Sequence, residues 1–385
     1  MNAAEFFAMF AVHICLVLFC IGYLAIGAIS IRNGKRQIAA TRTSAQRHPF
    51  ISVVMPTYNE EKIIASRLDS LLRATYPHDK MEIVVVDSSS DRTPEILESY
   101  ARKYPMINVI HDEERRGLAT ALNQAFRACK GEIVVKSDSD LTLADDALLK
   151  AVSHFEDPMV GAVTGRVNVA NDGVASEVRY RGLHEKIQLA ETEIDSVFMA
   201  QTFSAYRRHL MKEYKPTEYG DETIQTIHIR RQGFKVVYDP DVKFYEDYPE
   251  DGSERLRQKI RRSEGLTRLL LENSDMMFNS KYGKFGTYVL PSNFFMFIVS
   301  PLLLFVSPLV AAIDLAFFSV ATYLDIIVLA SFGIVVAARK TAAASNVWTF
   351  IELQYAQLQA LLNVTLIRKR DYKWKKIERV APTHI

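Results

Sequence analysis

Cysteine is scarce in this chain, which has three in 385 residues. Cys15 and Cys20 lie in an apolar segment near the start, and Cys129 stands alone in the polar part of the chain. A small secreted fold held by disulfides needs more cysteines, and a metal site built on cysteine needs them in closer groups. We therefore expect neither a disulfide framework nor cysteine ligation of a metal.

Charge is missing from two long blocks, although 24% of all residues are charged. Residues 6–31 contain no acidic or basic side chain other than His13, and only Asp314 and Asp325 interrupt residues 294–338. About 20 consecutive apolar residues are enough to cross a bilayer as a helix. We predict one transmembrane helix at residues 6–31 and two at residues 290–338.

The first block also lacks the marks of a secretory signal peptide, since no basic region precedes it and no A-x-A site precedes Arg32. Positive charge follows the first and last membrane segments instead, at Arg32, Lys35, Arg36, Arg42, Arg47, Arg339 and Lys340. By the positive-inside rule these flanks face the cytoplasm. We expect a multi-pass cell membrane protein with an external amino terminus and a cytoplasmic catalytic domain.

Two further segments are predicted to lie at the membrane surface. Residues 251–285 combine a run of arginines with leucines at helical spacing, which is typical of a basic amphipathic helix on lipid. Residues 345–368 form a second interfacial helix, because Glu352, Gln359 and Asn363 share one helical direction. The basic tail at residues 369–385 then lies in the cytoplasm, next to membrane lipids, and no nucleic-acid partner is expected.

Short apolar runs alternate with helical periodicity at the start of the domain predicted for residues 50–250. Strands are expected at residues 51–55, 82–86, 107–111 and 133–135, with a helix after each of the first three. Asn59 is a candidate N-cap of the first helix. This alternation predicts an α/β fold, mostly parallel, with helices on both faces of the sheet.

The second part of this domain is less regular. Strands are expected at residues 162–169 and 235–238, a strand region at 198–206, and helices at 178–193 and 221–232. Pro240 follows the last strand, where a proline is tolerated because no ladder hydrogen bond is needed.

Acidic and polar residues follow the predicted strands, at the carboxyl ends where such sheets bind ligands. Asp138 and Asp140 lie two residues apart on a chain expected to be extended, so their carboxylates point the same way and need a shared cation, Mg²⁺ or Mn²⁺. Taken alone, the pair also fits a solvated acidic turn. Asp87 fits either a nucleotide contact or an Asx-turn, and Glu60 either a ligand contact or a favourable place in a helix dipole.

Asp221 and Glu222 stand at the predicted start of a helix, after Gly220. A carboxylate there either caps the helix or acts as a general base, which must reach an acceptor hydroxyl. Spacing alone leaves both interpretations open.

With these residues in order, the chain resembles the inverting family 2 glycosyltransferases with the GT-A fold, of the membrane-attached kind that includes hyaluronan, chitin and cellulose synthases. The resemblance covers roughly residues 50–270. Its motifs are the PTYNE, VD, RG, DSD and GDE segments with the GFK turn and a Q-x-x-R pair, which contain Pro56, Tyr58, Glu60, Asp87, Arg116, Asp138, Asp140, Asp221, Glu222, Gln258 and Arg261.

The resemblance implies a role for each of these positions. Asp87 and the backbone near Tyr58 would hold the base of a nucleotide-sugar donor, most simply a UDP-sugar, with Pro56, Glu60 and Arg116 in the same crevice. Asp138 and Asp140 would hold the ribose and the metal diphosphate, and Gln258 and Arg261 the leaving diphosphate. The family register, eleven positions before the glycine of the GFK turn, makes Glu222 the base and Asp221 its alternative.

Two positions depart from the family pattern. Arg262 stands where processive synthases carry a tryptophan, so acceptor stacking would be lost or replaced by a guanidinium face. Leu118 stands where many relatives carry lysine. These departures favour transfer of one or a few sugars to a lipid-linked or saccharide acceptor over a processive polysaccharide synthase, and the intact aspartates argue against a non-catalytic nucleotide-sugar-binding module.

Overall fold

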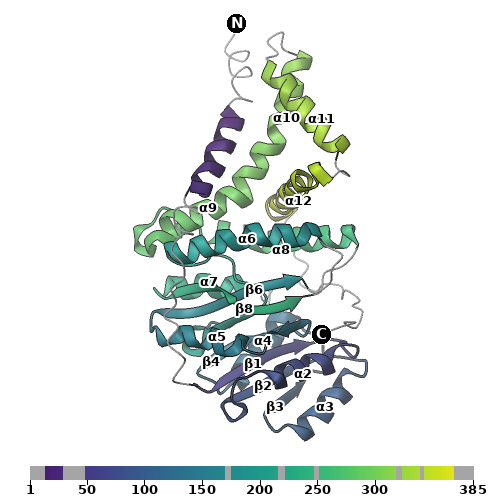
Figure 1. Cartoon of the computed structure of the whole chain (residues 1–385), viewed down its shortest axis with the longest axis vertical. Coiled ribbons are helices and arrows are strands. Elements are labelled where there is room, and N and C mark those ends of the chain that lie inside the picture. Colours follow the sequence, from purple (N-terminus) through teal and green to yellow (C-terminus); the bar gives the residue numbers. More distant parts are fainter. Residues whose placement is uncertain are drawn as a thin grey trace.

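The computed structural model describes residues 14–28, 48–169, 175–215, 222–246, 251–317, 323–338 and 342–367. Its layers follow one another along the long axis (Figure 1). A mixed sheet with its helices lies at one end, the long helices α6 (Ala175–Ile194) and α8 (Gly252–Glu272) cross above it, and the apolar helices stand beyond them.

Four parallel strands form the first half of the sheet, as the sequence predicted. They are β1 (Ile51–Thr57), β2 (Met81–Asp87), β3 (Ile107–His111) and β4 (Ile133–Lys136), in the order β3-β2-β1-β4. The helices that follow the first three are α2 (Ile64–Arg73), α3 (Thr93–Lys103) and α4 (Leu118–Ala128). β1, β2 and β4 are buried along nearly their whole length because helices cover both faces of the sheet, whereas the edge strand β3 is partly exposed.

The second half of the sheet continues beyond β4 in the order β7-β6-β8-β5. These strands are β5 (Leu141–Leu143), β6 (Val160–Val169), β7 (Ser204–Arg207) and β8 (Lys235–Glu246). Four of the seven strand pairs are parallel, and β7 pairs antiparallel with both of its neighbours. The remaining helices of this part are α5 (Ala147–Ser153) and α7 (Glu222–Arg231), with 3₁₀ turns at His78–Lys80, His154–Glu156, Arg208–Leu210, Ser274–Met276 and Ser280–Tyr282.

Most predicted strands differ by one or two residues from their observed bounds, and two differ by more. β8 runs through Pro240, because its ladder with β6 jumps from the Gly165–Asp239 pair to the Arg166–Lys243 pair and leaves a bulge in which proline needs no donor. A Cβ at Gly165 would lie 2.2 Å from the Val242 carbonyl oxygen, so this bulge requires glycine.

The strand expected at residues 198–206 is confined to β7. Before it, backbone N–H groups donate to side chains instead of to a strand ladder. Phe198 N donates to Glu191 Oε2 at 3.0 Å, and Gln201 N donates to Thr164 Oγ1 at 2.9 Å. Side-chain acceptors of this kind compete with the sheet for the same donors.

The apolar blocks of the sequence form helices at the far end from the sheet (Figure 1). One stretch among the described residues, Phe285–Ile313, is long and apolar enough to cross a membrane, and Ile14–Ala28 is a shorter apolar helix. The elements of this part are the π-helical turns Phe285–Val289, Phe295–Val299 and Asn363–Ile367, with α9 (Leu290–Phe294), α10 (Ser300–Phe317), α11 (Tyr323–Ala338) and α12 (Ala342–Leu362). The parts of the predicted membrane segments at residues 6–13, 29–31 and 318–322, and the tail at 369–385, lie outside the described residues.

Three apolar helices are tied together by a ring of hydrogen bonds. Tyr23 Oη and Ser300 Oγ are 3.0 Å apart, Ser300 Oγ donates to Gln354 Oε1 at 2.7 Å, and Gln354 Nε2 donates to Tyr23 Oη at 3.1 Å. Because the Ser300 proton is used toward Gln354, Tyr23 is the donor to Ser300. Each side chain therefore both donates and accepts, and no buried polar atom of the ring is left unpaired.

The polar side of α12 faces α8. Asn363 Nδ2 donates to Glu264 Oε1 at 2.6 Å, and the Lys259 ammonium lies 3.9 Å from the Glu352 carboxylate. Glu352 and Asn363 belong to the polar direction that the sequence assigned to one side of an interfacial helix. That side contacts the α8 layer.

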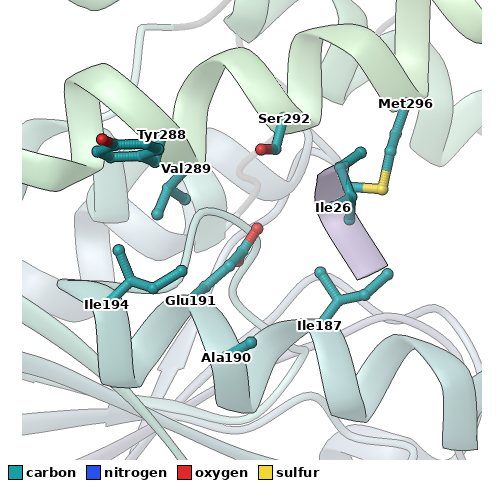
Figure 2. A pocket seen from close by; sticks show the side chains of 9 residues that line it. All are labelled: Ile26, Ile187, Ala190, Glu191, Ile194, Tyr288, Val289, Ser292 and Met296. Carbon is teal, nitrogen blue, oxygen red and sulfur yellow. The ribbon is translucent and has the colours of Figure 1, made fainter. Parts of the chain in front are cut away.

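A small pocket lies where the sheet domain meets the apolar helices (Figure 2). Its lining is apolar except for Glu191 and Ser292, and comprises Ile26, Ile187, Ala190, Glu191, Ile194, Tyr288, Val289, Ser292 and Met296. Glu191 rises from α6 toward the helix that carries Ser292. It accepts hydrogen bonds from Asn293 Nδ2 at 2.5 Å and Phe198 N at 3.0 Å, and burial raises its pKa to about 7.

We predict that Glu191 makes the free energy of unfolding fall as pH rises. The folded protein keeps the Glu191 proton up to about pH 7, whereas the unfolded chain releases it near pH 4.3. This contribution to stability is therefore complete below about pH 4.3 and is lost as the pH rises from there to about 7. Between pH 5 and the pKa of about 7 the loss is about 3 kcal/mol, at roughly 1.4 kcal/mol per pKa unit. Unfolding in detergent at pH 5 and pH 8 measures it, and Glu191→Gln removes this part of the slope.

The control for the loss of one negative charge is Glu272→Gln, because Glu272 is exposed. An equal pH slope in the wild type and in Glu191→Gln would contradict the assignment.

Candidate active site

The carboxyl ends of β1 and β2 hold Asp87 in a fixed position. Asp87 Oδ1 accepts hydrogen bonds from Thr57 Oγ1 at 2.8 Å and from Ser89 Oγ at 2.5 Å. Its other oxygen, Oδ2, is buried and has no hydrogen-bond partner among the residues that the structure describes. A buried acceptor without a donor is costly, so this oxygen suits a ligand N–H or O–H.

The loop after β1 is fastened to the loop after β2. Asn59 N donates to Ser89 Oγ at 2.7 Å, Ser90 N donates to Asn59 Oδ1 at 2.8 Å, and Glu60 N donates to Thr93 Oγ1 at 2.8 Å. Asn59 has φ 56°, and the helix begins at Ile64, so the prediction that Asn59 caps the helix is wrong. Its short polar side chain tolerates this left-handed backbone and serves the neighbouring loop instead.

The predicted donor contacts Tyr58 and Arg116 lie around the same end of the sheet. The guanidinium of Arg115 lies 4.0 Å from the centroid of the Tyr58 ring, a cation–π contact. Arg116 makes two hydrogen bonds to Asp112 Oδ2, through Nε at 3.1 Å and Nη2 at 2.9 Å. Pro56 is the penultimate residue of β1 and pairs with Val86. The loops after β1, β2 and β3 therefore lie next to one another at the same edge of the sheet.

Asp138 and Asp140 belong to a turn, not to an extended chain as the sequence analysis assumed. Leu141 N donates to Asp138 O at 3.2 Å, and the chain continues directly into β5. The turn exists because β5 pairs with β8 at the far edge of the sheet, so the chain must leave the line of β4 at this point.

Lys136 joins the two acidic parts of the site. This last residue of β4 is 1% exposed, and its ammonium donates to Asp138 Oδ1 at 2.8 Å and to Glu222 Oε1. Glu222 is the first residue of α7 and is buried. Glu222 lies 86 residues after Lys136 in the sequence, so this contact brings the start of α7 to the end of β4.

The charges around Lys136 keep it protonated. Burial alone would lower its pKa, but the carboxylates of Asp138 and Glu222 outweigh this effect and raise the pKa above its ordinary value. Of the two acidic residues predicted at the start of this helix, Glu222 contacts Lys136, and Asp221 lies outside the described residues.

The residues at this turn fit a divalent cation that is shared with a substrate. No group of three or more histidine, cysteine or acidic side chains suitable for a metal occurs in the part of the chain that the structure describes. Mg²⁺ and Mn²⁺, however, are commonly held by one or two carboxylates together with substrate phosphate oxygens. Asp138 and Asp140 supply such carboxylates.

α8 carries the remaining predicted donor contacts, Gln258, Arg261 and Arg262. Arg262 Nη2 donates to Glu246 Oε1 at 2.9 Å, which joins α8 to the end of β8. Glu246 is buried and pairs with Leu141, directly after the turn of Asp138 and Asp140. Arg262 is thus held near the acidic turn by an ion pair.

Sequence reasoning gave no role to Lys136 or Ser89, and it placed Thr57 at the strand end without its contact to Asp87. A signal for Lys136 was present, because a lysine that closes a buried apolar strand must have acidic partners. Thr57 and Ser89 gave no such signal, since hydroxyl residues are common in turns for local reasons.

Comparison with known proteins identifies the family. Residues 52–215 match the family model described as Glycosyl transferase family 2. This segment is therefore a family 2 glycosyltransferase domain with the GT-A fold, and the transferase class predicted from the motifs is confirmed.

Three similar proteins illustrate the range of the family. A β-monoglucosyldiacylglycerol synthase of Trichormus variabilis is 35% identical over 40% of this chain and 32% of its own length. A poly-β-1,6-N-acetyl-D-glucosamine synthase of Staphylococcus epidermidis is 25% identical over 66% of this chain and 63% of its own. The mannosyltransferase PcManGT from Pyrobaculum calidifontis, solved with GDP-Man and Mn²⁺, superposes with a TM-score of 0.77 at 25% identity and covers 93% of this chain and 99% of its own.

The matches therefore span about a third of the first relative and two thirds of the second, whereas the solved mannosyltransferase matches along nearly its whole length.

We predict that Lys136→Met destabilises the fold by about 3 to 5 kcal/mol, because it leaves the Glu222 carboxylate buried without its cation. Urea unfolding in detergent measures the change. Lys150→Met is the matched control, since the Lys150–Asp146 pair is partly exposed, unlike Lys136, and its loss costs less than about 1 kcal/mol. The double variant Lys136→Met/Glu222→Gln should recover part of the loss, and equal stability of the two lysine variants would contradict the role of Lys136.

Proposed function

We propose that this protein is a membrane-bound, metal-dependent inverting glycosyltransferase that moves a sugar from a nucleotide-sugar donor to a lipid-linked or saccharide acceptor. The observation that carries the proposal is the contact of Lys136 with both Asp138 and Glu222. It joins the acidic turn expected at the donor diphosphate to the carboxylate expected to deprotonate the acceptor.

The donor would lie along the crevice at the ends of β1, β2 and β4. Asp87, with Pro56, Tyr58, Glu60 and Arg116 around it, would hold the nucleoside. Asp138 and Asp140 would hold the ribose, the diphosphate and its Mg²⁺ or Mn²⁺, and a bound ion would neutralise negative charge on the leaving nucleoside diphosphate. Gln258 and Arg261 on α8 would contact the same leaving group.

The reaction would be a single in-line displacement at the anomeric carbon. The bond from carbon to the diphosphate oxygen breaks as the acceptor oxygen bonds from the opposite side, which inverts the configuration. Glu222 takes the proton of the acceptor hydroxyl. The Lys136 ammonium contacts the Glu222 carboxylate on one oxygen, Oε1.

We consider two classes of acceptor, a lipid-linked acceptor and a growing polysaccharide. The similarity to a synthase named for a glucosylated diacylglycerol supports a lipid-linked acceptor, and the similarity to a poly-N-acetylglucosamine synthase supports the alternative of a processive enzyme. The ion pair of Arg262 with Glu246 favours the first, because a guanidinium held by a carboxylate is a poorer stacking surface for a growing chain than tryptophan. We therefore propose transfer of one or a few sugars.

The proposed setting is the cell membrane. Residues 6–31 and 290–338 would cross it, and the GT-A domain of residues 50–250 would lie in the cytoplasm. The segments at residues 251–285 and 345–368 would lie at the lipid surface, and the tail at 369–385 on the cytoplasmic side. The apolar stretch Phe285–Ile313 and its place beyond the α6 and α8 layer support this arrangement (Figure 1).

We predict that Glu222→Gln lowers the rate of sugar transfer by about 10² to 10⁴-fold, the usual contribution of a general base. It should leave the Mn²⁺-dependent binding of nucleoside diphosphate within about twofold. Asp140→Asn should weaken that binding as well. Transfer from radiolabelled donors by protein in detergent, together with calorimetric titration of the nucleotide, separates the two effects.

Asp146→Asn, which changes a half-exposed carboxylate paired with Lys150, is the control. Unchanged transfer by both Glu222→Gln and Asp140→Asn would overturn the proposed function.

A further inference from the structure

The helix that carries the proposed base, Glu222, is also tied to the start of the apolar stretch Phe285–Ile313. We propose that Arg230 and Asp195 are positioning residues, which hold this base at a fixed distance from the apolar stretch so that sugar passes to acceptors anchored in the bilayer. This inference rests on the proposed function and concerns how the same site meets its acceptor.

Arg230 lies in the last turn of α7 and is buried, with 6% of its side chain exposed. Its Nη2 lies 3.2 Å from Asp195 Oδ1 and donates to the backbone carbonyl of Tyr282 at 3.2 Å. Its Nη1 donates to the carbonyl of Phe234 at 2.8 Å. A guanidinium presents its donors in a rigid planar fork, so these contacts also fix its direction. The end of α7 is therefore held to the end of α6 and to the segment just before the apolar stretch.

Asp195 connects this arginine with the apolar stretch itself. It directly follows α6, and its second oxygen, Oδ2, accepts a hydrogen bond from Phe285 N at 3.0 Å. Such N–H groups at the start of a helix have no partner within the helix. Gly283 has φ 60°, and a Cβ there would lie 2.9 Å from the same oxygen, so this close approach requires glycine. One carboxylate thus bridges α7 and the first residue of the apolar stretch.

The other end of α7 is held by the contact of Glu222 with Lys136 on β4. The helix between the two ends has ten residues, of which eight are buried, and at 1.5 Å per residue it spans about 15 Å. It is stiff because each interior N–H donates to the carbonyl four residues before it. Contacts at both ends of a stiff, packed helix therefore keep the base and the apolar stretch at a constant separation.

This separation matters for an acceptor that the bilayer holds. The acceptor hydroxyl then lies at a limited depth, and Glu222 must come within about 2.6–3.2 Å of it to take its proton. A misplacement of about 1 Å can cost about 100-fold in rate. Water reaches the base without any such constraint. The Arg230–Asp195 pair should therefore affect transfer to a lipid acceptor and spare hydrolysis of the donor by water.

The test compares these two reactions in Arg230→Met and in Asp195→Asn. The full chain is placed in phosphatidylcholine vesicles that contain dioleoylglycerol and polyprenyl phosphate, with Mn²⁺ and radiolabelled UDP-glucose, UDP-N-acetylglucosamine or GDP-mannose. Sugar in the lipid phase measures transfer, and free sugar in water measures hydrolysis. Each variant should lower kcat for transfer about tenfold and leave hydrolysis and the donor KM within about twofold.

Three further variants keep the result interpretable. Arg230→Lys retains a charge opposite Asp195 and should recover part of the transfer. The double variant Arg230→Met/Asp195→Asn leaves neither charge without its partner, so it serves if a single variant does not fold, and it should show the same split. Arg127→Met is the matched control, because Arg127 forms an exposed pair with Glu213. It should behave as the wild type, and melting curves check the fold of each variant.

The possible results separate the two proposals. Equal losses of transfer and hydrolysis would mean that the pair only stabilises the fold, and unchanged transfer would mean that it has no part in the reaction. Either result overturns this inference, whereas transfer by the wild type would still support the proposed function. A wild type that neither transfers nor hydrolyses any of the three donors would overturn both.

Discussion

A single buried ammonium determines much of what this molecule can do. Lys136 is part of a central strand, and its charge would be intolerable there without the carboxylates of Asp138 and Glu222. The need to satisfy it brings the first residue of α7 to the end of β4, although 86 residues separate the two in the chain. The geometry of the candidate active site follows from this electrostatic requirement as much as from the topology of the sheet.

The parallel half of the sheet was predictable because local patterns determine it. Apolar runs give β1 to β4, and the predicted bounds of β3 are those of the structure. The second half depends on contacts between distant segments. β8 passes Pro240 only because Gly165 lets the neighbouring backbone approach, and β7 is short because side chains of Glu191 and Thr164 take donors from the segment before it.

In the candidate site, too, the residues that local motifs contain were predictable, and the contacts between distant segments were not. Asp87, Asp138, Asp140 and Glu222 could be named from motif spacing and family resemblance. What each oxygen contacts could not be named, because Thr57, Ser89 and His111 reach Asp87 from three different segments. Asn59 illustrates the limit most clearly, since the same side chain fits a helix cap by composition and in the structure fastens two loops together.

The hydrogen-bond ring of Tyr23, Ser300 and Gln354 has a direction, since each group donates to the next and accepts from the one before. Apolar helices in a hydrocarbon setting pack almost equally well after a slide of one turn or a small rotation, because most of their surface is interchangeable. A closed ring exists in one relative setting of the three helices and is broken in every other. The ring therefore selects one relative position of the apolar helices among many of similar packing energy. Because α12 also contacts α8, the ring helps to fix the position of these helices on the α8 layer.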